Sequence, residues 1–400
     1  MKYTDIAIIG GGLAGSTAAA MLGRAGIASV LIDPHETYPF DFRVEKISGE
    51  EQVGRFEQTG IADSVLRSAT YDNENWIARF GYLLDRKPTR QYGIMYDALV
   101  EAVRAEIKAP AEIIYAKAVD VATGSERQKL TLSSGETISA RLVVLASGLS
   151  VALRRNLGIE RKVLSAAHSI SVGFDIVPVG RPAFEFPALT YFSERASRRV
   201  PYVTLFPIGG RMRANLFAYR ELDDHWLREM RHHPAETMDA ALPRLRRIIG
   251  DYAVAGDVKI RPADVYVSTG HRQAGVVLVG DAFAATCPVT GTGTDKVFTD
   301  VARLCNVHIP AWLGTEGMGA DKIATFYDDP VKQACDNWSM GKAFSFRKVS
   351  VETGLYWRAQ RWARFLAGFG EGVLRRMRDG ISAGSKRPTR PSSSSLSSSA

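Results

Sequence analysis

The sequence predicts an α/β fold in which a βαβ-based domain is interrupted by a mostly antiparallel sheet and followed by a helical C-terminal region. Three observations predict it. A strand, a glycine turn, a helix and a second strand open the chain, strand-like segments dominate residues 165–264, and residues 320–378 show helical spacing of apolar side chains. A chain of 400 residues suits two joined domains with an appendage.

The opening unit begins with the apolar strand Asp5–Ile9 and continues into an Ala-rich helical run, Ser16–Arg24. Between them lies Gly10-x-Gly12-x-x-Gly15. In such a turn the first glycine permits the tight bend, the second lets the backbone approach a pyrophosphate, and the third lets the helix pack on the strand. The pattern is typical of dinucleotide binding, because the start of a helix offers free N–H groups to phosphates.

The second strand of this unit, Ala28–Ile32, ends at Asp33. A carboxylate at that position accepts hydrogen bonds from the ribose hydroxyls of a bound dinucleotide. We therefore expect Asp33 to contact the adenosine half of the ligand.

A second glycine-containing turn follows the apolar strand Val276–Val279 and begins with Gly280-Asp281. A carboxylate delivered there can accept from a ribityl hydroxyl. Free N–H groups near Gly291 can face the part of a flavin that becomes negative on reduction. Three further residues of this loop precede or begin the next helix, namely Pro288, Gly293 and Thr294.

Together the two turns resemble those of the class A flavoprotein monooxygenases of the para-hydroxybenzoate hydroxylase type. The resemblance implies FAD on a Rossmann-type domain, NAD(P)H as electron donor, and hydroxylation of an organic substrate with O₂ through a flavin C4a-hydroperoxide. It assigns cofactor contacts to Gly10, Gly12, Leu13, Ala14, Gly15, Asp33, Arg43, Val119, Gly148, Asp281, Pro288, Gly291, Gly293 and Thr294.

Two positions depart from that family. Ser147 stands where the family has an Asp in its middle motif, although Gly148, Ser150 and Arg154 are kept, and Ala284 stands where the family has a His. Because the middle Asp is tied to the handling of flavin and NAD(P)H, Ser147 leaves direct reduction by NAD(P)H open.

The resemblance also suggests domain boundaries. We expect the FAD-binding domain to comprise residues 1–70, 93–162 and 265–320, and the substrate domain to comprise 71–92 and 163–264. A helical region would then cover 321–379, and the polar, Ser-rich residues 380–400 are expected to be disordered.

The candidates for catalysis are few, and none is identified as a general base. Glu45 and Lys46 lie in a loop expected near the flavin, where they tune its charge, bind substrate or form a surface ion pair. His168 falls in the substrate sheet, while Cys287 and Pro288 fall in the flavin loop, where Cys287 is either redox-active or a small packing residue.

The composition bears on the cellular compartment and on metal binding. The three cysteines have neither metal-type spacing nor an even number, so we expect no metal and a reducing, cytoplasmic compartment. No apolar run is long enough for a membrane-spanning helix.

The net charge of +8 belongs to the C-terminal part, because from Lys342 onward 12 Lys/Arg stand against three acids. There, aromatic and aliphatic side chains such as Trp362 and Phe369 recur at helical spacing among arginines. Such a helix can pack on its own domain, hold a protein partner, or lie peripherally on an anionic membrane. No nucleic-acid fold accompanies the charge, so we expect no nucleic-acid partner.

Three functions follow. The first is the hydroxylation of a small organic or lipid substrate. The second is a geranylgeranyl-reductase-like or dehydrogenase-type reaction without oxygen insertion. The third is an FAD-binding accessory protein that acts on a protein partner. A flavin halogenase is disfavoured because the sequence lacks a WxWxIP-type motif.

Overall fold

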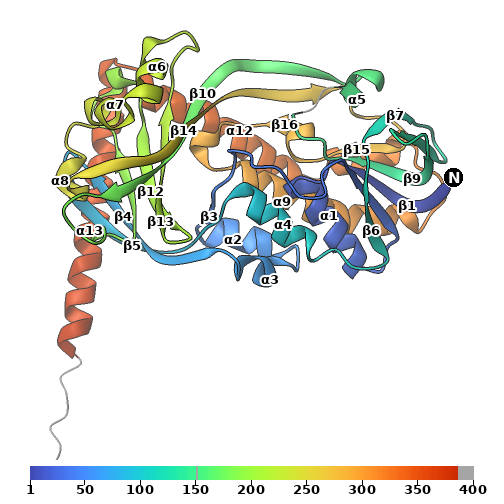
Figure 1. Ribbon diagram of the computed structural model, residues 1–400, viewed down its shortest axis with the longest axis horizontal. Helices are drawn as coiled ribbons and strands as arrows, with labels where there is room; N and C mark the ends of the chain where they lie inside the picture. The colour runs from blue at the N-terminus through green and yellow to red at the C-terminus, as the bar shows by residue number, and fades with distance from the viewer. Residues whose placement is uncertain (150–151, 386–400) are drawn as a thin grey trace, which may run out of the picture.

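Two β-sheets organise the chain, whose computed structural model describes residues 1–149 and 152–385 (Figure 1). One sheet has seven strands and the other nine. The α/β architecture predicted from the sequence is confirmed, with a parallel sheet in one half of the molecule and a largely antiparallel sheet in the other.

The seven-stranded sheet has the order β6-β2-β1-β9-β8-β7, and β15 pairs with the end of β9. Its parallel strands contain buried apolar runs, as strands covered on both faces require, except that the edge strand at residues 111–115 is partly exposed. They are β1 (Lys2–Ile9), β2 (Ser29–Asp33), β6 (Ala111–Tyr115), β9 (Thr137–Leu145) and β15 (Val276–Leu278), while β7 (Ala118–Ala122) and β8 (Gln128–Leu132) are antiparallel.

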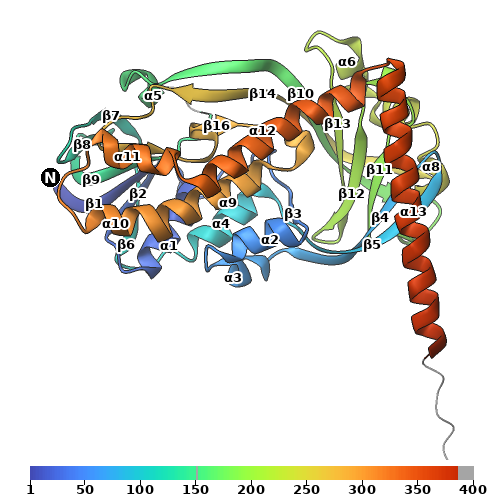
Figure 2. The same cartoon turned by 180° about the vertical axis from the view of Figure 1, so that it is seen from behind.

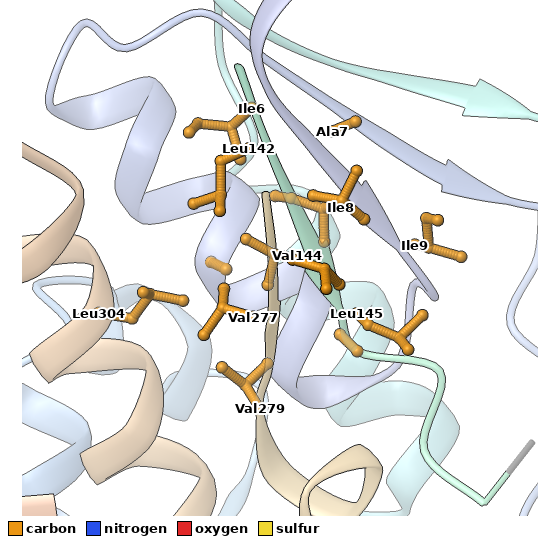
Figure 3. Close-up of a cluster of buried hydrophobic side chains, with 14 of the residues drawn as sticks. Ile6, Ala7, Ile8, Ile9, Leu142, Val144, Leu145, Val277, Val279 and Leu304 are labelled. Carbon is orange, nitrogen blue, oxygen red and sulfur yellow. The ribbon is translucent and has the colours of Figure 1, made fainter. Parts of the chain in front are cut away.

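The core of this half lies between the sheet and its helices. Figure 3 shows Ile8 of β1, Val144 of β9 and Val277 of β15 packed together with Leu304 from the neighbouring helical segment. All four are fully buried. Burial of side chains of this size contributes about 1.5–3 kcal/mol each, so the framework under the glycine turn is rigid.

The nine-stranded sheet has the order β16-β14-β10-β13-β12-β11-β4-β5-β3 and is antiparallel except where β11 pairs with β4. Its strands are β3 (Lys46–Ser48), β4 (Thr70–Arg79), β5 (Tyr82–Gly93), β10 (Glu160–Pro178), β11 (Ala188–Phe192), β12 (Tyr202–Ile208), β13 (Arg211–Ala218), β14 (Tyr252–Thr269) and β16 (Ala284–Ala285). Figure 1 shows β10 and β14 running together as a ribbon between the two halves.

Helices cover both sheets. Beside the parallel sheet lie α1 (Leu13–Arg24), α2 (Glu50–Glu57), α3 (Ala62–Leu66), α4 (Tyr96–Arg104), α5 (Ala152–Asn156), α9 (Gly293–Arg303), a π-helix (Leu304–His308), α10 (Ile309–Leu313) and α11 (Ala320–Tyr327). The nine-stranded sheet carries α6 (His225–His232), α7 (Pro234–Ala241) and α8 (Arg246–Ile249). α12 (Pro330–Val351) leads to α13 (Leu355–Ser385), and short 3-10 turns occur at Ala196–Arg198, Gly280–Ala282 and Pro288–Thr290.

Some local expectations need correction. Residues 71–92 form two long strands joined at a single tight turn rather than several short strands. The helix expected over 234–249 is divided into α7 and α8, with Pro243 between them. Residues 380–385, expected to be disordered, continue α13, whereas 386–400 lie outside the described residues. The large sheet also takes in β3, which falls in the first segment of the predicted FAD-binding domain, so those boundaries stay a prediction.

Among residues 1–149 and 152–385, no helix is long and apolar enough to cross a membrane.

Candidate active site

A cavity of about 760 Å³ lies where the carboxyl ends of the parallel strands meet the large sheet. One wall is formed by the start of α1, the end of β2 and the loop that follows β9. The opposite wall is formed by β10, β12, β13 and β14. This is the crevice where open α/β sheets bind their ligands.

The glycine turn after β1 has a shape that only glycine permits. Gly10 has φ of +104°, and a Cβ there would lie 2.6 Å from the carbonyl oxygen of Ala146. A Cβ on Gly15 would lie 1.9 Å from the carbonyl oxygen of Gly10, so the helix approaches the strand at this point. Gly10, Gly12, Leu13 and Ala14 line the cavity, while Gly15 packs behind them.

Asp33, expected to contact the ribose, lines the cavity, and it is held by groups that the sequence did not point to. Its carboxylate accepts from the N–H of Gly11 at 2.7 Å and pairs with Arg104 at 3.1 Å. Arg104, whose side chain is buried, also donates to the carbonyl oxygen of Gly11 at 3.0 Å. The cation therefore ties the glycine turn to the end of β2. The sequence signal that could have indicated this role of Arg104 is a charged residue among the apolar positions of α4.

Arg43 lines the cavity close to the second predicted motif. Its guanidinium is 3.4 Å from the carboxylate of Asp281 and forms a short ion pair with Asp41. Burial lowers the pKa of Arg43, but Tyr96, Asp41 and Asp281 outweigh that effect and raise it above its usual range. Gly148, which also lines the cavity, has φ of +56° and faces Arg43.

The loop that carries Asp281 is anchored from below by a buried cluster of charges. Asp300 of α9 accepts from the N–H of Gly280 at 2.9 Å and contacts Lys296 and Lys332 at 3.0 Å each. All three charged side chains are at most 3% exposed. Because an uncompensated buried charge is costly, the cluster fixes this turn firmly.

The second loop then brings four more predicted residues to the cavity. Gly291 has φ of +69°, the left-handed conformation that ends the 3-10 turn before α9. Pro288, Gly291, Gly293 and Thr294 all line the cavity. The start of α9 therefore faces the same space as the start of α1.

Glu45 does not form the surface ion pair with Lys46 that the sequence allowed. Its side chain is fully buried and accepts two hydrogen bonds from Arg213 of β13, at 2.7 and 2.8 Å. Burial raises the pKa of Glu45, and Arg213 acts against that rise. The adjacent opposite charges suggested a local pair, but the backbone of an extended segment points neighbouring side chains to opposite sides.

Lys46 lies on the cavity wall with its ammonium 4.8 Å from the centre of the Phe206 ring. Burial lowers its pKa to about 8, while Asp72 acts in the opposite direction. A lysine that titrates this close to neutrality can exchange a proton with a bound ligand, which an ordinary surface lysine does not do efficiently.

Two polar side chains of the large sheet face the cavity side by side. Thr204 of β12 and Asn215 of β13 are cross-strand partners, and both line the cavity. Within the described part of the chain, the Oγ1 atom of Thr204 and the Oδ1 atom of Asn215 are buried and have no hydrogen-bond partner. Buried polar atoms are normally satisfied, so this pair is suited to a ligand that donates hydrogen bonds.

Besides Gly15, three predicted site residues lie outside the cavity lining. His168 is buried against α12, 3.4 Å from the carbonyl oxygen of Ala343, and burial together with Arg347 lowers its pKa to about 4. Cys287 is buried beside Ser169, and burial raises the pKa of its thiol. Val119 lies on β7, exposed to solvent. None of the three is placed to touch a ligand in this cavity.

No group of three or more His, Cys, Asp or Glu side chains in the described ranges has the arrangement of a metal site. Cys287, Cys305 and Cys335 are free thiols, and all are buried.

Comparison with known proteins agrees with this geometry. A family model described as an FAD binding domain matches residues 3–311. The chain is 25% identical over 380 residues to 3-demethoxyubiquinol 3-hydroxylase of Escherichia coli (strain K12), and the match covers 84% of this chain and 87% of that protein.

Two solved structures share the fold. p-Nitrophenol 4-monooxygenase PnpA from Pseudomonas putida DLL-E4 superposes with a TM-score of 0.72 at 16% identity, covering 98% of this chain and all of that one. The flavin-dependent brominase Bmp2 superposes with a TM-score of 0.67 at 14% identity, covering 94% of this chain and 100% of that one.

Proposed function

The chain belongs to the FAD binding domain family and is an FAD-dependent monooxygenase, and on that premise we propose that it hydroxylates a small organic compound bearing a hydrogen-bond donor. The observation that carries the proposal is that the glycine turn, Asp33 and the polar pair Thr204 and Asn215 line one and the same cavity. One end suits a dinucleotide and the other suits a substrate.

The residues present fit FAD. Gly10, Gly12, Leu13 and Ala14 would accept the pyrophosphate at the start of α1, with Gly15 keeping the helix close, and Asp33 would hold the ribose. The flavin end would be contacted by Arg43, Gly148, Asp281, Pro288, Gly291, Gly293 and Thr294. When bound, FAD supplies the oxygen-activating chemistry, and the protein positions it and excludes water. Val119 does not line this cavity, so we do not propose that it contacts FAD.

The substrate would be oriented by the large sheet. A hydroxyl or amino group on it can donate to the free oxygens of Thr204 and Asn215. A site built around such a bond discriminates strongly against analogues that lack the donor, because its own polar atoms are then left unpaired. The relatives named above act on p-nitrophenol and on a demethoxyubiquinol, so phenols are the first compounds to test.

Lys46 would take a proton from the substrate hydroxyl. Lys46 lines the cavity, and burial lowers its pKa to about 8, which places a useful fraction in the neutral form near physiological pH. Glu45 would act indirectly, by holding Arg213 behind the same wall. His168 and Cys287 are not proposed for catalysis, and Pro288 is proposed only to shape the flavin loop.

The test is product analysis with ¹⁸O₂. FAD-loaded protein is reduced anaerobically with NADPH or NADH, then mixed with p-nitrophenol or demethoxyubiquinol and labelled oxygen. Hydroxylation that replaces a hydrogen increases product mass by about 18 units with the label and by about 16 with ordinary O₂, whereas hydroxylation at the nitro-bearing carbon of p-nitrophenol would release nitrite and leave a labelled quinone. A saturated or dehydrogenated product without label would favour the reductase or dehydrogenase alternative, and a brominated product with bromide present would favour halogenation.

Substitution of the polar pair connects that activity to the cavity. Thr204→Val should reduce kcat/KM for a phenol about 10- to 100-fold, the effect of losing roughly 1–3 kcal/mol of hydrogen bonding. Thr131→Val, in β8 and away from the cavity, is the matched control. Equal activity of both variants would contradict the proposed orientation.

We propose NAD(P)H as the electron donor. Ser147 lines the cavity at the position where related flavoproteins carry an Asp. Ser147→Asp is therefore expected to accelerate flavin reduction by NADPH or NADH in stopped-flow. If neither the native protein nor this variant is reduced, a separate reductase must deliver the electrons. The free thiols favour a reducing compartment, and we propose the cytoplasm.

A further inference from the structure

The C-terminal helix α13 lies across the outer end of the large sheet and extends beyond it (Figure 2). Its inward face is packed closely. Phe365 contacts the ring of Phe80 edge-on at 5.4 Å, and a Cβ on Gly372 would lie 2.2 Å from the carbonyl oxygen of Leu84. Arg375 pairs with Asp85 at 3.5 Å. The helix is therefore fixed to the body of the protein by one side.

The opposite side of α13 is apolar and exposed. We define the outer stripe as the exposed apolar residues Leu355, Trp362, Leu366, Phe369, Leu374 and Met377. At 100° per residue they lie within about two fifths of the helix circumference, and the centre of the stripe is turned away from Phe365 and Gly372. Trp362, toward one margin of the stripe, also stacks on Phe80 of the body at 5.6 Å. Isolated exposed apolar residues are common, but a contiguous stripe marks an interaction surface. Arg358 and Arg364 are exposed, as in the sequence alternative in which the helix packs on its own domain with arginines outward. Arg361 and Arg375 instead contact the body.

Positive charge borders the stripe. Between Leu355 and Arg375 the helix carries four arginines and a single acid, Glu371. Arg358 and Arg361 lie toward the side on which Trp362 meets the body, and Arg364 lies toward the other side. An exposed apolar stripe with basic margins is the pattern of a helix that lies in the interface of an anionic bilayer.

A second cavity, of about 320 Å³, opens beside the stripe. It is lined by four arginines, two from the body and two from α13: Arg79, Arg195, Arg358 and Arg361. Arg79 and Arg361 line the same cavity, and burial first, then the charge of Arg361, lower the pKa of Arg79. The acid in the lining, Glu194, already accepts from the hydroxyl of Tyr191 at 2.8 Å.

This cavity has the chemistry of a phosphate site. Arginine guanidinium groups bind phosphate oxygens through paired, charge-assisted hydrogen bonds. Arg358 and Trp362 border both the cavity and the stripe, so a phosphate bound here would place attached acyl chains next to the stripe.

We propose that α13 docks the enzyme on the surface of an anionic phospholipid bilayer, with the outer stripe in the acyl boundary and the arginine-lined cavity around a lipid phosphate. A second copy of the chain fits less well, because a symmetric contact through the stripe would bring the same arginines of both copies together. An anionic bilayer offers both an apolar acyl region for the outer stripe and negatively charged headgroups for the arginines.

The test uses the full-length FAD-loaded protein and sedimentation with vesicles. The protein should bind vesicles of phosphatidylcholine mixed with phosphatidylglycerol, not vesicles of phosphatidylcholine alone, and high salt should release it. Arg358→Gln should weaken the partition about fivefold, the equivalent of ~1 kcal/mol per basic residue at the surface. Arg67→Gln, which removes an equal charge from an exposed position near α3, should not change it.

The apolar contribution is tested with Leu366→Glu, since Leu366 is 61% exposed and its replacement removes no buried packing. It should abolish vesicle binding, while Val331→Glu, at a position 49% exposed on α12, should leave it unchanged. Unaltered flavin absorbance and thermal unfolding would verify that each variant is folded.

A labelled variant gives a second readout. Because the three native cysteines are buried, Leu366→Cys can be labelled selectively with an environment-sensitive fluorophore. Its emission should rise and shift to the blue on anionic vesicles, whereas the same label on Ser134→Cys, in the exposed turn between β8 and β9, should not respond. Equal binding to neutral vesicles, or a dimer that Leu366→Glu converts to a monomer without any effect on lipid binding, would overturn the proposal.

Discussion

Replacing Arg213 with Met should destabilise the enzyme strongly, and the size of the effect follows from its contacts. Arg213 donates to Glu45 at 2.7 and 2.8 Å and to Asp175 at 3.2 Å. Its side chain is 7% exposed, and that of Glu45 is fully buried. Removing one partner of a buried pair leaves an uncompensated charge, so Arg213→Met should reduce the free energy of unfolding by about 3–5 kcal/mol at pH 7.

The same substitution should change the pH dependence of stability. Arg213 is among the groups that lower the pKa of Glu45, so its removal raises that folded-state pKa further above the value of about 4.3 for an unfolded Glu. Stability from a group with a raised pKa is present below the unfolded value and is lost as pH rises through the folded one. The deficit of Arg213→Met should therefore be smaller at about pH 5 than at pH 7.

Urea denaturation of the FAD-loaded protein at both pH values measures this effect. Arg211→Met is the matched control, because Arg211 pairs with the same Asp175 at 3.1 Å but is 63% exposed, and its loss should change the free energy of unfolding by less than ~1 kcal/mol. Glu45→Gln added to Arg213→Met should restore part of the stability. Equal effects of the two arginine variants, or a deficit independent of pH, would refute the reasoning.

Three further predictions concern the cavity. Gly10→Ala should lower the free energy of unfolding by about 1–3 kcal/mol through its positive φ alone. It should also reduce the FAD retained on purification, measured from the ratio of flavin to protein absorbance, while the control Gly54→Ala should retain FAD. In the native enzyme kcat/KM should rise as pH increases through about 8, and Lys46→Met should remove that rise; an unchanged pH profile would argue against Lys46 as the base. Asp300→Asn should reduce stability by roughly 3–5 kcal/mol in thermal unfolding, far more than Asp321→Asn at an exposed position, and similar losses would contradict a fixed loop.

The sequence predicted those parts of the site that depend on local geometry. A glycine turn needs residues of adjacent positions, so Gly10, Gly12 and Asp33 could be read from spacing, and so could Asp281 and Gly291 in the second loop. The structure brings these two loops to one cavity, although they are far apart in the chain.

Contacts between distant elements could not be predicted in this way. Nothing near Glu45 indicates that Arg213 will meet it, and the adjacent Lys46 suggested the wrong partner. The pair Thr204 and Asn215 becomes visible only once the register of β12 and β13 is known. His168 is a residue type often used in catalysis. Side chains alternate between the two faces of its strand, however, and that of His168 points toward α12 instead of the cavity.

The order of strands in the parallel sheet has a consequence for synthesis of the protein. β15 completes this sheet beside β9, yet 130 residues separate Leu145 from Val276, and five of the nine strands of the large sheet, β10 to β14, are encoded between them. A nascent chain therefore emerges with its first dinucleotide motif long before α9 can supply the second. Because domains generally fold as units during translation, most strands of the large sheet are available to pair while the parallel sheet still lacks β15. A complete cofactor site is therefore available only after about three quarters of the chain has been made.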